Sequence, residues 1–327
     1  MKILLNAHYR IAARSCQTAL LILLPLLAQA QGYPAKPIRI LVGPGPDVIA
    51  RTFAQKFTDA WGQQIVIDQR PGAGGNIAAE LAAKAPTDGY TLLVATSAFA
   101  ANVILQPGPF DLVKDFAPVA LFATSPLILT VHPSVPATTV QELVALAKAR
   151  PGQLNYASTG NGTAPHLGGE MFKTAARIDL VHVPYKGAGP AIVDVMAGQI
   201  QVYFQIAPGV LGALQSGKIR GLAVSSLQRS KLAPELPTMS EAGYPGFHAA
   251  GWNGLVAPAG SPRAVINQLH AEIIRLLAHP DVTKRLTGAG WEPASTSNNT
   301  PDTFGQFIKS EIAKFAKVIK ENGLKVD

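Results

Sequence analysis

The order of apolar and polar positions along the chain predicts strands that alternate with helices. Residues 36–42 (KPIRILV) place an apolar side chain at every second position, which is typical of a strand with one buried face. Asp47 can cap the helix that follows, whose apolar side chains recur at steps of four residues. These side chains are Ile49, Phe53, Phe57 and Trp61.

The same pattern continues through most of the chain and falls into two sets. In the first set we expect further strands at 64–68 and 90–95, with a helix at 76–85 between them. The second set comprises strands at 120–131 (one long strand or two), 154–157, 179–183, 201–204, 219–224 and 252–257, and helices at 139–149, 163–176, 189–197, 207–214, 261–277 and from 300 onward. Strand–helix–strand order predicts parallel sheets with helices on their faces.

Two sets of this size predict a two-lobed α/β fold in which each lobe is a mostly parallel sheet flanked by helices. We assign residues 31–125 plus 253–327 to the first lobe and residues 126–252 to the second. The chain then crosses between the lobes twice, near 125–133 and near 247–254. Two crossing strands form a natural hinge, so a ligand site is expected between the lobes.

The first thirty residues have the pattern of a secretory signal. Lys2, Arg10 and Arg14 precede a short apolar run at 19–27, and Ala28-Gln29-Ala30 fits the small-x-small cleavage pattern. We expect residues 1–30 to be removed and the mature protein to be secreted; an ordinary buried helix is the alternative. The single cysteine, Cys16, lies in this segment, so neither a disulfide framework nor a Cys-ligated metal site within one chain is expected.

Composition and charge narrow the classes of partner. A chain of 327 residues that is 48% hydrophobic has ample core and is not intrinsically disordered. Loss of the three basic residues of the signal lowers the net charge from +8 to +5. This charge is spread along the chain, which does not indicate nucleic-acid binding, but it can attract small anions. The apolar run 119–131 is too short to span a membrane, so we expect a buried strand there.

Candidate binding groups follow the predicted strands, because ligands of open α/β sheets lie beyond the carboxyl ends of the strands. Five loops rich in glycine or hydroxyl groups occur there, at 43–46, 72–75, 96–97, 158–163 and 185–189. Each alone is an ordinary turn. Together, their backbone N–H groups, hydroxyls and helix N-termini would hold a small anion, a carboxylate above all, without a catalytic group.

Motifs for enzymatic chemistry are absent from the sequence. Ser97 lies in Ala95-Thr96-Ser97-Ala98-Phe99 rather than in a Gly-x-Ser-x-Gly turn. No phosphate-binding Gly-x-x-x-x-Gly-Lys-Ser/Thr, no Gly-x-Gly-x-x-Gly after a strand and no His-Glu-x-x-His occurs. We therefore expect no enzyme, no cofactor and no metal. His182 is expected to be structural, whereas His166 can face the cleft and Lys186 can pair with an anion.

Several short motifs occur in a characteristic order. They are Arg70-Pro71-Gly72-Ala73-Gly74-Gly75-Asn76-Ile77, Asp88-Gly89-Tyr90-Thr91-Leu92-Leu93, Lys114-Asp115-Phe116-Ala117-Pro118-Val119, Leu154-Asn155-Tyr156-Ala157-Ser158, His182-Val183-Pro184-Tyr185-Lys186-Gly187 and Pro237-Thr238-Met239-Ser240-Glu241-Ala242-Gly243. This set resembles the Bug-type receptors of tripartite tricarboxylate transporters, a class of periplasmic solute-binding proteins. The resemblance covers nearly the whole mature chain.

The resemblance implies a Venus-flytrap fold (type II-like) that binds a small carboxylated solute as a monomer and delivers it to membrane transporter subunits. A binding protein that signals to a membrane sensor is the alternative, and a secreted hydrolase is a third. By position, the resemblance implies ligand contacts from Thr96, Ser97, Ser158, Thr159 and Gly160, then from Thr163, His166, Tyr185, Gly189 and Gln205, and last from Gly43, Gly45, Gly74, Gly75 and Lys186.

Two departures from the family pattern affect these expectations. Only Gly43-Pro44-Gly45-Pro46 separates Val42 from Asp47, so this shortened loop offers fewer backbone donors. Gln205 stands where many relatives carry an Asp, and an amide can hydrogen-bond a ligand amino group but cannot form an ion pair with it. We therefore expect a ligand other than an amino acid.

Overall fold

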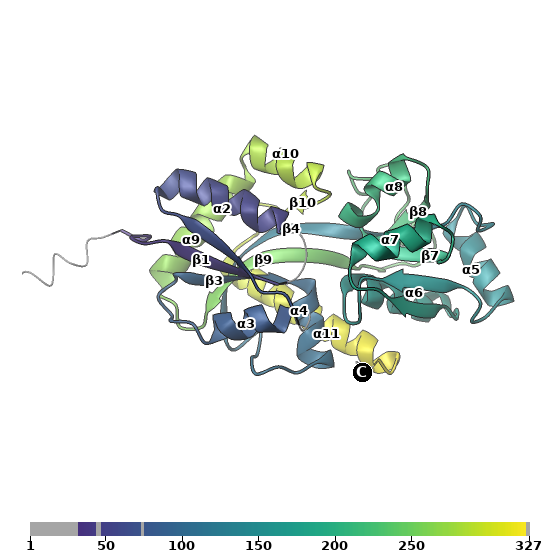
Figure 1. Cartoon of the computed structure of the whole chain (residues 1–327), viewed down its shortest axis with the longest axis horizontal. Coiled ribbons are helices and arrows are strands. Elements are labelled where there is room, and N and C mark those ends of the chain that lie inside the picture. The colour runs from purple at the N-terminus through teal and green to yellow at the C-terminus, as the bar shows by residue number, and fades with distance from the viewer. Residues whose placement is uncertain (1–31, 44–46, 73–74, 325–327) are drawn as a thin grey trace, which may run out of the picture.

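The computed structural model describes residues 32–43, 47–72 and 75–324, which form two lobes joined by two strands (Figure 1). In the first lobe three strands run parallel in the order β2-β1-β3, and β9 lies antiparallel beside β3. These strands are β1 (Ile38–Val42), β2 (Ile65–Gln69), β3 (Thr91–Thr96) and β9 (Ala250–Pro258). The predicted strand–helix alternation is thus confirmed for this part of the chain.

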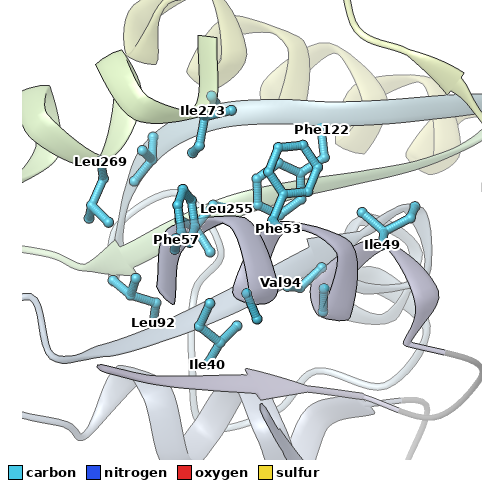
Figure 2. Packing of buried hydrophobic residues seen from close by; sticks show 14 of the residues in the cluster. Ile40, Ile49, Phe53, Phe57, Leu92, Val94, Phe122, Leu255, Leu269 and Ile273 are labelled. Carbon is cyan, nitrogen blue, oxygen red and sulfur yellow. The ribbon is translucent and has the colours of Figure 1, made fainter. Parts of the chain in front are cut away.

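Helices cover both faces of the first sheet. On one face lie α2 (Val48–Trp61), α9 (Arg263–Leu277) and α10 (Pro280–Gly288), and on the other α3 (Asn76–Ala83), α4 (Ser97–Leu105) and α11 (Pro301–Glu321). Successive strand residues alternate between the faces of the sheet. Leu92 packs with the apolar side chains of α2, α9 and α10, and Leu93 packs with those of α3, α4 and α11. Phe53 of α2 stacks on Phe122, with ring centroids 4.0 Å apart (Figure 2).

The second lobe repeats this plan. Its parallel strands lie in the order β7-β5-β6, and a segment of β4 lies antiparallel between β7 and β8. The strands are β5 (Asn155–Ser158), β6 (Val181–Pro184), β7 (Val202–Ile206) and β8 (Arg220–Val224). The helices are α5 (Val140–Ala149), α6 (Ala164–Ala176), α7 (Ala188–Met196), the 3₁₀ turn η3 (Ala207–Gly209) and α8 (Leu211–Gln215).

The long strand β4 (Phe116–Val131) belongs to both sheets. It pairs with β9 from Phe116 to Pro126, and from Leu127 onward its partners are β7 and β8. The predicted apolar run at 119–131 is therefore a buried crossing strand. A two-residue strand, β10 (Glu292–Pro293), pairs with the first-lobe part of β4. Among the described residues, no helix is both long and apolar enough to cross a membrane.

Each predicted strand is present, and the largest change is at β4, which begins at Phe116 rather than at 120. The prediction missed α4, α10 and β10, and it gave one helix at 207–214 where η3 and α8 occur. The cap expected for α2 was wrong: Asp47 makes no cap hydrogen bond and instead pairs with Arg51. At the start of α6, Thr163 makes no cap bond although its position and residue type favour one, because its hydroxyl donates to the carbonyl of Gly160. The predicted signal at 1–30 lies outside the described residues.

Candidate ligand-binding site

The predicted loops gather at two edges of the sheets, one in each lobe. In the first lobe, Val42 at the end of β1 lies beside Gln69 at the end of β2, and the neighbouring β3 ends at Thr96. In the second lobe, Ser158 at the end of β5 lies beside Pro184 at the end of β6. Each edge therefore collects the groups that follow parallel strands, as the sequence predicts.

A direct contact connects the two lobes. Gly162 follows β5, and a Cβ added to it would lie 2.9 Å from Cδ1 of Leu105 and 3.1 Å from Oδ1 of Asn102. Leu105 and Asn102 belong to α4, the helix that follows β3 and lies on the side of the first lobe nearest to the second (Figure 1). The loop Thr159–Thr163, called the 159–163 loop below, thus lies against the helix that Ser97 begins.

Helix N-termini at these edges are left open. The helices α4, α6 and α7 each follow a parallel strand, and none has a side-chain cap or an acidic residue in its first turn. By contrast, α5, α10 and α11 follow no parallel strand, and each has a side-chain cap and an acidic residue in its first turn. The helix α9 also follows no parallel strand, but it has neither a side-chain cap nor an acidic residue in its first turn. Uncapped N–H groups and the positive end of the helix dipole favour an anion at these edges.

Hydroxyl groups without a partner lie at the same edges. Within the described ranges, the hydroxyls of Thr96, Ser97 and Thr159 have no hydrogen bond to the protein. Ser97 is the first residue of α4 and is only 8% exposed. Their open hydrogen-bonding capacity is met by water or by a ligand. These three hydroxyls are therefore available to a ligand.

Other predicted site residues are already bonded inside the second lobe. Thr163 donates to the Gly160 carbonyl (2.7 Å), and the Tyr185 hydroxyl donates to Oδ2 of Asp194 (2.6 Å). Gln205 is buried; its Nε2 donates to the Tyr203 hydroxyl and its Oε1 accepts from the backbone N–H of Ile206. These side chains shape the site from within the lobe, and Gln205 has both ends of its amide occupied.

The remaining predicted residues lie at the same edges or outside the described chain. A Cβ added to Gly43 would lie 3.2 Å from Cα of Gly75, so the loops after β1 and β2 meet. Gly189 lies exposed in the first turn of α7, and Lys186 is exposed just before that helix. Gly45 and Gly74 lie outside the described residues.

Ser158 and the two histidines form a buried network that sequence reasoning did not find. The Oγ atom of Ser158 lies 2.7 Å from Nε2 of His182, and Nδ1 of His166 accepts the backbone N–H of Gly162 at 3.1 Å. Burial, followed by the nearby His166 and Lys173, lowers the pKa of His182 to about 3. Burial also lowers the pKa of His166, with Glu170 opposing and Lys173 adding to the shift. Both rings are therefore neutral at neutral pH.

This network does not have the chemistry of a nucleophile and base. Ser158 is fully buried, and a His182 ring with a pKa of about 3 is too weak a base to take its proton at neutral pH. The signal that could have found the network was the pairing of residues 154–157 with 179–183, since the parallel register places Tyr156 beside His182.

Two lobes joined by crossing strands, with open polar groups at the strand ends of each lobe, are typical of a protein that binds a small solute between its lobes. The chain belongs to the tripartite tricarboxylate transporter receptor family (TctC), whose family model matches residues 49–324. It is thus a solute-binding receptor of the TctC/Bug family, whose members are periplasmic receptors. The predicted family, the predicted fold class and the expectation of no enzyme are confirmed.

Similar proteins cover almost the whole chain. BugT of Bordetella pertussis is 37% identical over 306 residues, which are 91% of this chain and 92% of BugT. Rpa4515 of R. palustris, solved with adipate, has a TM-score of 0.81 and 33% identity over 90% of this chain and 99% of that one. MatC of Rhodopseudomonas palustris, solved with bound malate, has a TM-score of 0.77 and 30% identity over 88% of this chain and all of that one.

Proposed function

We propose that this receptor captures a small carboxylated compound between its lobes and delivers it to the membrane subunits of a tripartite tricarboxylate-type transporter. The observation that carries the proposal is the set of hydroxyls without a partner among the described residues (Thr96, Ser97 and Thr159) beside open helix N-termini at the strand ends of both lobes. Such groups donate hydrogen bonds, and a carboxylate accepts them. Related structures with adipate and with malate support this class of ligand.

The proposed site divides into groups that touch the ligand and groups that support them. Thr96 and Ser97 bind from the first lobe (31–125 plus 253–327), and Thr159, Gly160 and Gly189 bind from the second (126–252). Ser158, Thr163, Tyr185 and Gln205 support the second-lobe edge through their internal bonds. Contacts from both lobes favour a closed form, which the transporter recognises.

The route to the periplasm and the form of the receptor belong to the same proposal. Residues 1–30 act as a signal that is removed on export, and the mature chain works as a monomer. Gly43 and Lys186 are the outer contacts of the site; Lys186 is exposed and, among the described residues, forms no ion pair, so it can approach a second carboxylate of a longer ligand.

Thermal-shift screening of carboxylic acids against neutral sugars tests the proposed function. We expect at least one mono-, di- or tricarboxylate to raise the melting temperature, since a ligand at a hundred times its Kd adds about 2.7 kcal/mol. Ser97→Ala and Thr159→Val are expected to weaken binding of that acid about threefold to tenfold each, because each removes one hydrogen-bond donor.

The matched control is Ser310→Ala on α11, whose hydroxyl donates to the carbonyl of Phe307 within its own helix. This variant is expected to bind the acid like the wild type. Stabilisation by neutral sugars with no effect of any carboxylate would contradict the proposal, as would unchanged affinity in both site variants.

A further inference from the structure

Three aromatic rings form a stack beneath the 159–163 loop. The rings of His166 and His182 lie 4.1 Å apart between centroids and 15° from parallel. The ring of Tyr156 lies on the other side of His182, at 4.8 Å and 26°. The three rings come from different elements: Tyr156 from β5, His182 from β6 and His166 from the first turn of α6. The stack therefore joins two strands and a helix directly behind the loop.

The base of the stack is fixed by buried polar groups. The Tyr156 hydroxyl donates to Oε1 of Glu170 at 2.6 Å, and Nζ of Lys173 lies 2.9 Å from the same oxygen. Glu170 is 3% exposed and lies one helical turn beyond His166. Since the buried carboxylate is satisfied by two partners, the rings have a rigid support.

The upper atoms of the stack hold the loop backbone. Nδ1 of His166 accepts the N–H of Gly162 at 3.1 Å. Nε2 of His182 lies 2.7 Å from Oγ of Ser158, and the same Oγ accepts the N–H of Gly160 at 3.2 Å. Both glycines have positive φ angles, 128° at Gly160 and 74° at Gly162. Two imidazole nitrogens thus fix the two unusual backbone positions of the loop, one directly and one through Ser158.

We propose that His166 and His182 are positioning residues that hold the 159–163 loop in its binding conformation, and that neither ring touches the ligand. This inference rests on the proposed function, since the loop carries Thr159 and contacts α4 of the first lobe through Gly162. It revises the sequence-based expectation for His166, which is 4% exposed and uses Nδ1 inside the lobe. The acceptor role of His166 needs the neutral form of its ring, because a protonated imidazole has no lone pair to offer to the N–H of Gly162.

Paired substitutions distinguish the hydrogen-bonding role of each histidine from the packing role of its ring. His166→Phe keeps a flat ring for stacking but removes the acceptor for Gly162, whereas His166→Asn keeps an acceptor near the position of Nδ1. His182→Phe and His182→Gln make the same comparison for the contact with Ser158, because the Gln side chain reaches the position of Nε2. In each pair, a purely structural role of the ring would make the phenylalanine variant the milder one.

The first readout is the affinity for adipate or malate, whichever gives the larger thermal shift with the wild type. We expect both phenylalanine variants to bind about tenfold more weakly, because a buried polar group loses its hydrogen-bond partner, and the Asn and Gln variants to stay within about threefold of wild type. Wild-type affinity in the phenylalanine variants, or equal losses within each pair, would overturn the proposal.

The second readout needs no ligand and is hydrogen exchange of the backbone amides in residues 159–163. We expect faster exchange in His166→Phe and His182→Phe than in the matched Asn and Gln variants. If neither acid binds the wild type, the proposed function fails for these acids while the exchange still decides the positioning role. Unchanged exchange in the phenylalanine variants would contradict that role.

Discussion

His182 gives the receptor a pH-dependent stability at the residue level. Burial, with His166 and Lys173 nearby, lowers its pKa to about 3, whereas the unfolded chain has a histidine pKa of about 6.5. As the pH falls from about 6.5 toward 3, the unfolded state takes up a proton that the folded state excludes, so unfolding is favoured. We expect the urea midpoint of the wild type to fall through this window more steeply than that of His182→Gln.

The comparison of urea midpoints between about pH 7 and about pH 4 isolates His182, because other groups change equally in both proteins. Backbone N–H groups of Thr138 and Thr238 lower the pKa values of Glu142 and Glu241, which also destabilises the fold in acid. Burial lowers the pKa of His248 in the same direction as that of His182. Urea midpoints of the wild type and of His182→Gln that fall in parallel would show that His182 does not cause the loss of stability in acid.

Individual site residues were only partly predictable, because hydrogen bonding between distant segments decides which groups are free. Ser158 and Thr159 are neighbours with similar side chains, yet Ser158 is engaged by His182 and Gly160, while Thr159 has no partner among the described residues. The pairing of β5 with β6 makes that difference, and local sequence does not reveal it. Gln205 differs, because its partners Tyr203 and Ile206 lie within two residues of it on the same strand, β7.

At the scale of elements, α6 lies unusually close to the second sheet because of two adjacent glycines. A Cβ added to Gly169 would lie 2.3 Å from Cε2 of Tyr156, and one added to Gly168 would lie 2.4 Å from Cδ1 of Leu127. Such distances do not occur in real structures, so any side chain would push the helix or the ring away. The glycines therefore let α6 bring His166 onto the ring of His182.

Gly169→Ala tests whether this close packing outweighs helix propensity. Alanine favours the helix by about 1 kcal/mol, but overpacking in a core costs about 1–3 kcal/mol and would also disturb the Tyr156–Glu170 bond. We expect a net loss of stability in urea unfolding. The control is Gly212→Ala in α8, where an added Cβ meets no atom within 4 Å and a gain of up to about 1 kcal/mol is expected. A more stable Gly169→Ala variant would refute the packing argument.

Elements with a strong period were predictable, and those without one were not. The strands were found because their apolar runs are bounded by turn residues, and α2 because its buried side chains recur every four residues. In α4 the buried residues 99–102 are consecutive, so no stripe marks the helix. The start of α10 is capped by His279, whose Nδ1 accepts the N–H of Asp281, which is an uncommon signal.

For the whole molecule, the shared strand β4 sets where the lobes can move relative to each other. Its pairing changes from β9 to β7 and β8 between Pro126 and Leu127, close to the predicted crossing near 125–133. Away from this hinge, the lobes touch where α6 packs against α11, with Oγ1 of Thr174 donating to Oδ1 of Asn322 at 2.8 Å. They also touch where Gly162 faces α4. The second contact involves the 159–163 loop, which also carries Thr159 of the proposed site, so ligand binding and lobe approach depend on the same loop.

Gly162→Ala is expected to hold the lobes apart. The added methyl would lie 2.9 Å from Leu105, so it would act as a wedge between the 159–163 loop and α4. The substitution also has a backbone cost of about 1 kcal/mol at a φ of 74°. Gly246→Ala is the matched control, because Gly246 has a φ of 75° and an added Cβ there meets no atom within 4 Å.

Both variants should therefore lose similar stability, but only Gly162→Ala should lose binding. We expect its affinity for adipate or malate to fall about tenfold, because the closed form is destabilised by about 1.4 kcal/mol relative to the open form. Its radius of gyration in small-angle scattering at saturating acid should stay larger than that of Gly246→Ala. If the two variants bind equally well and scatter alike, the contact between Gly162 and α4 does not control closure.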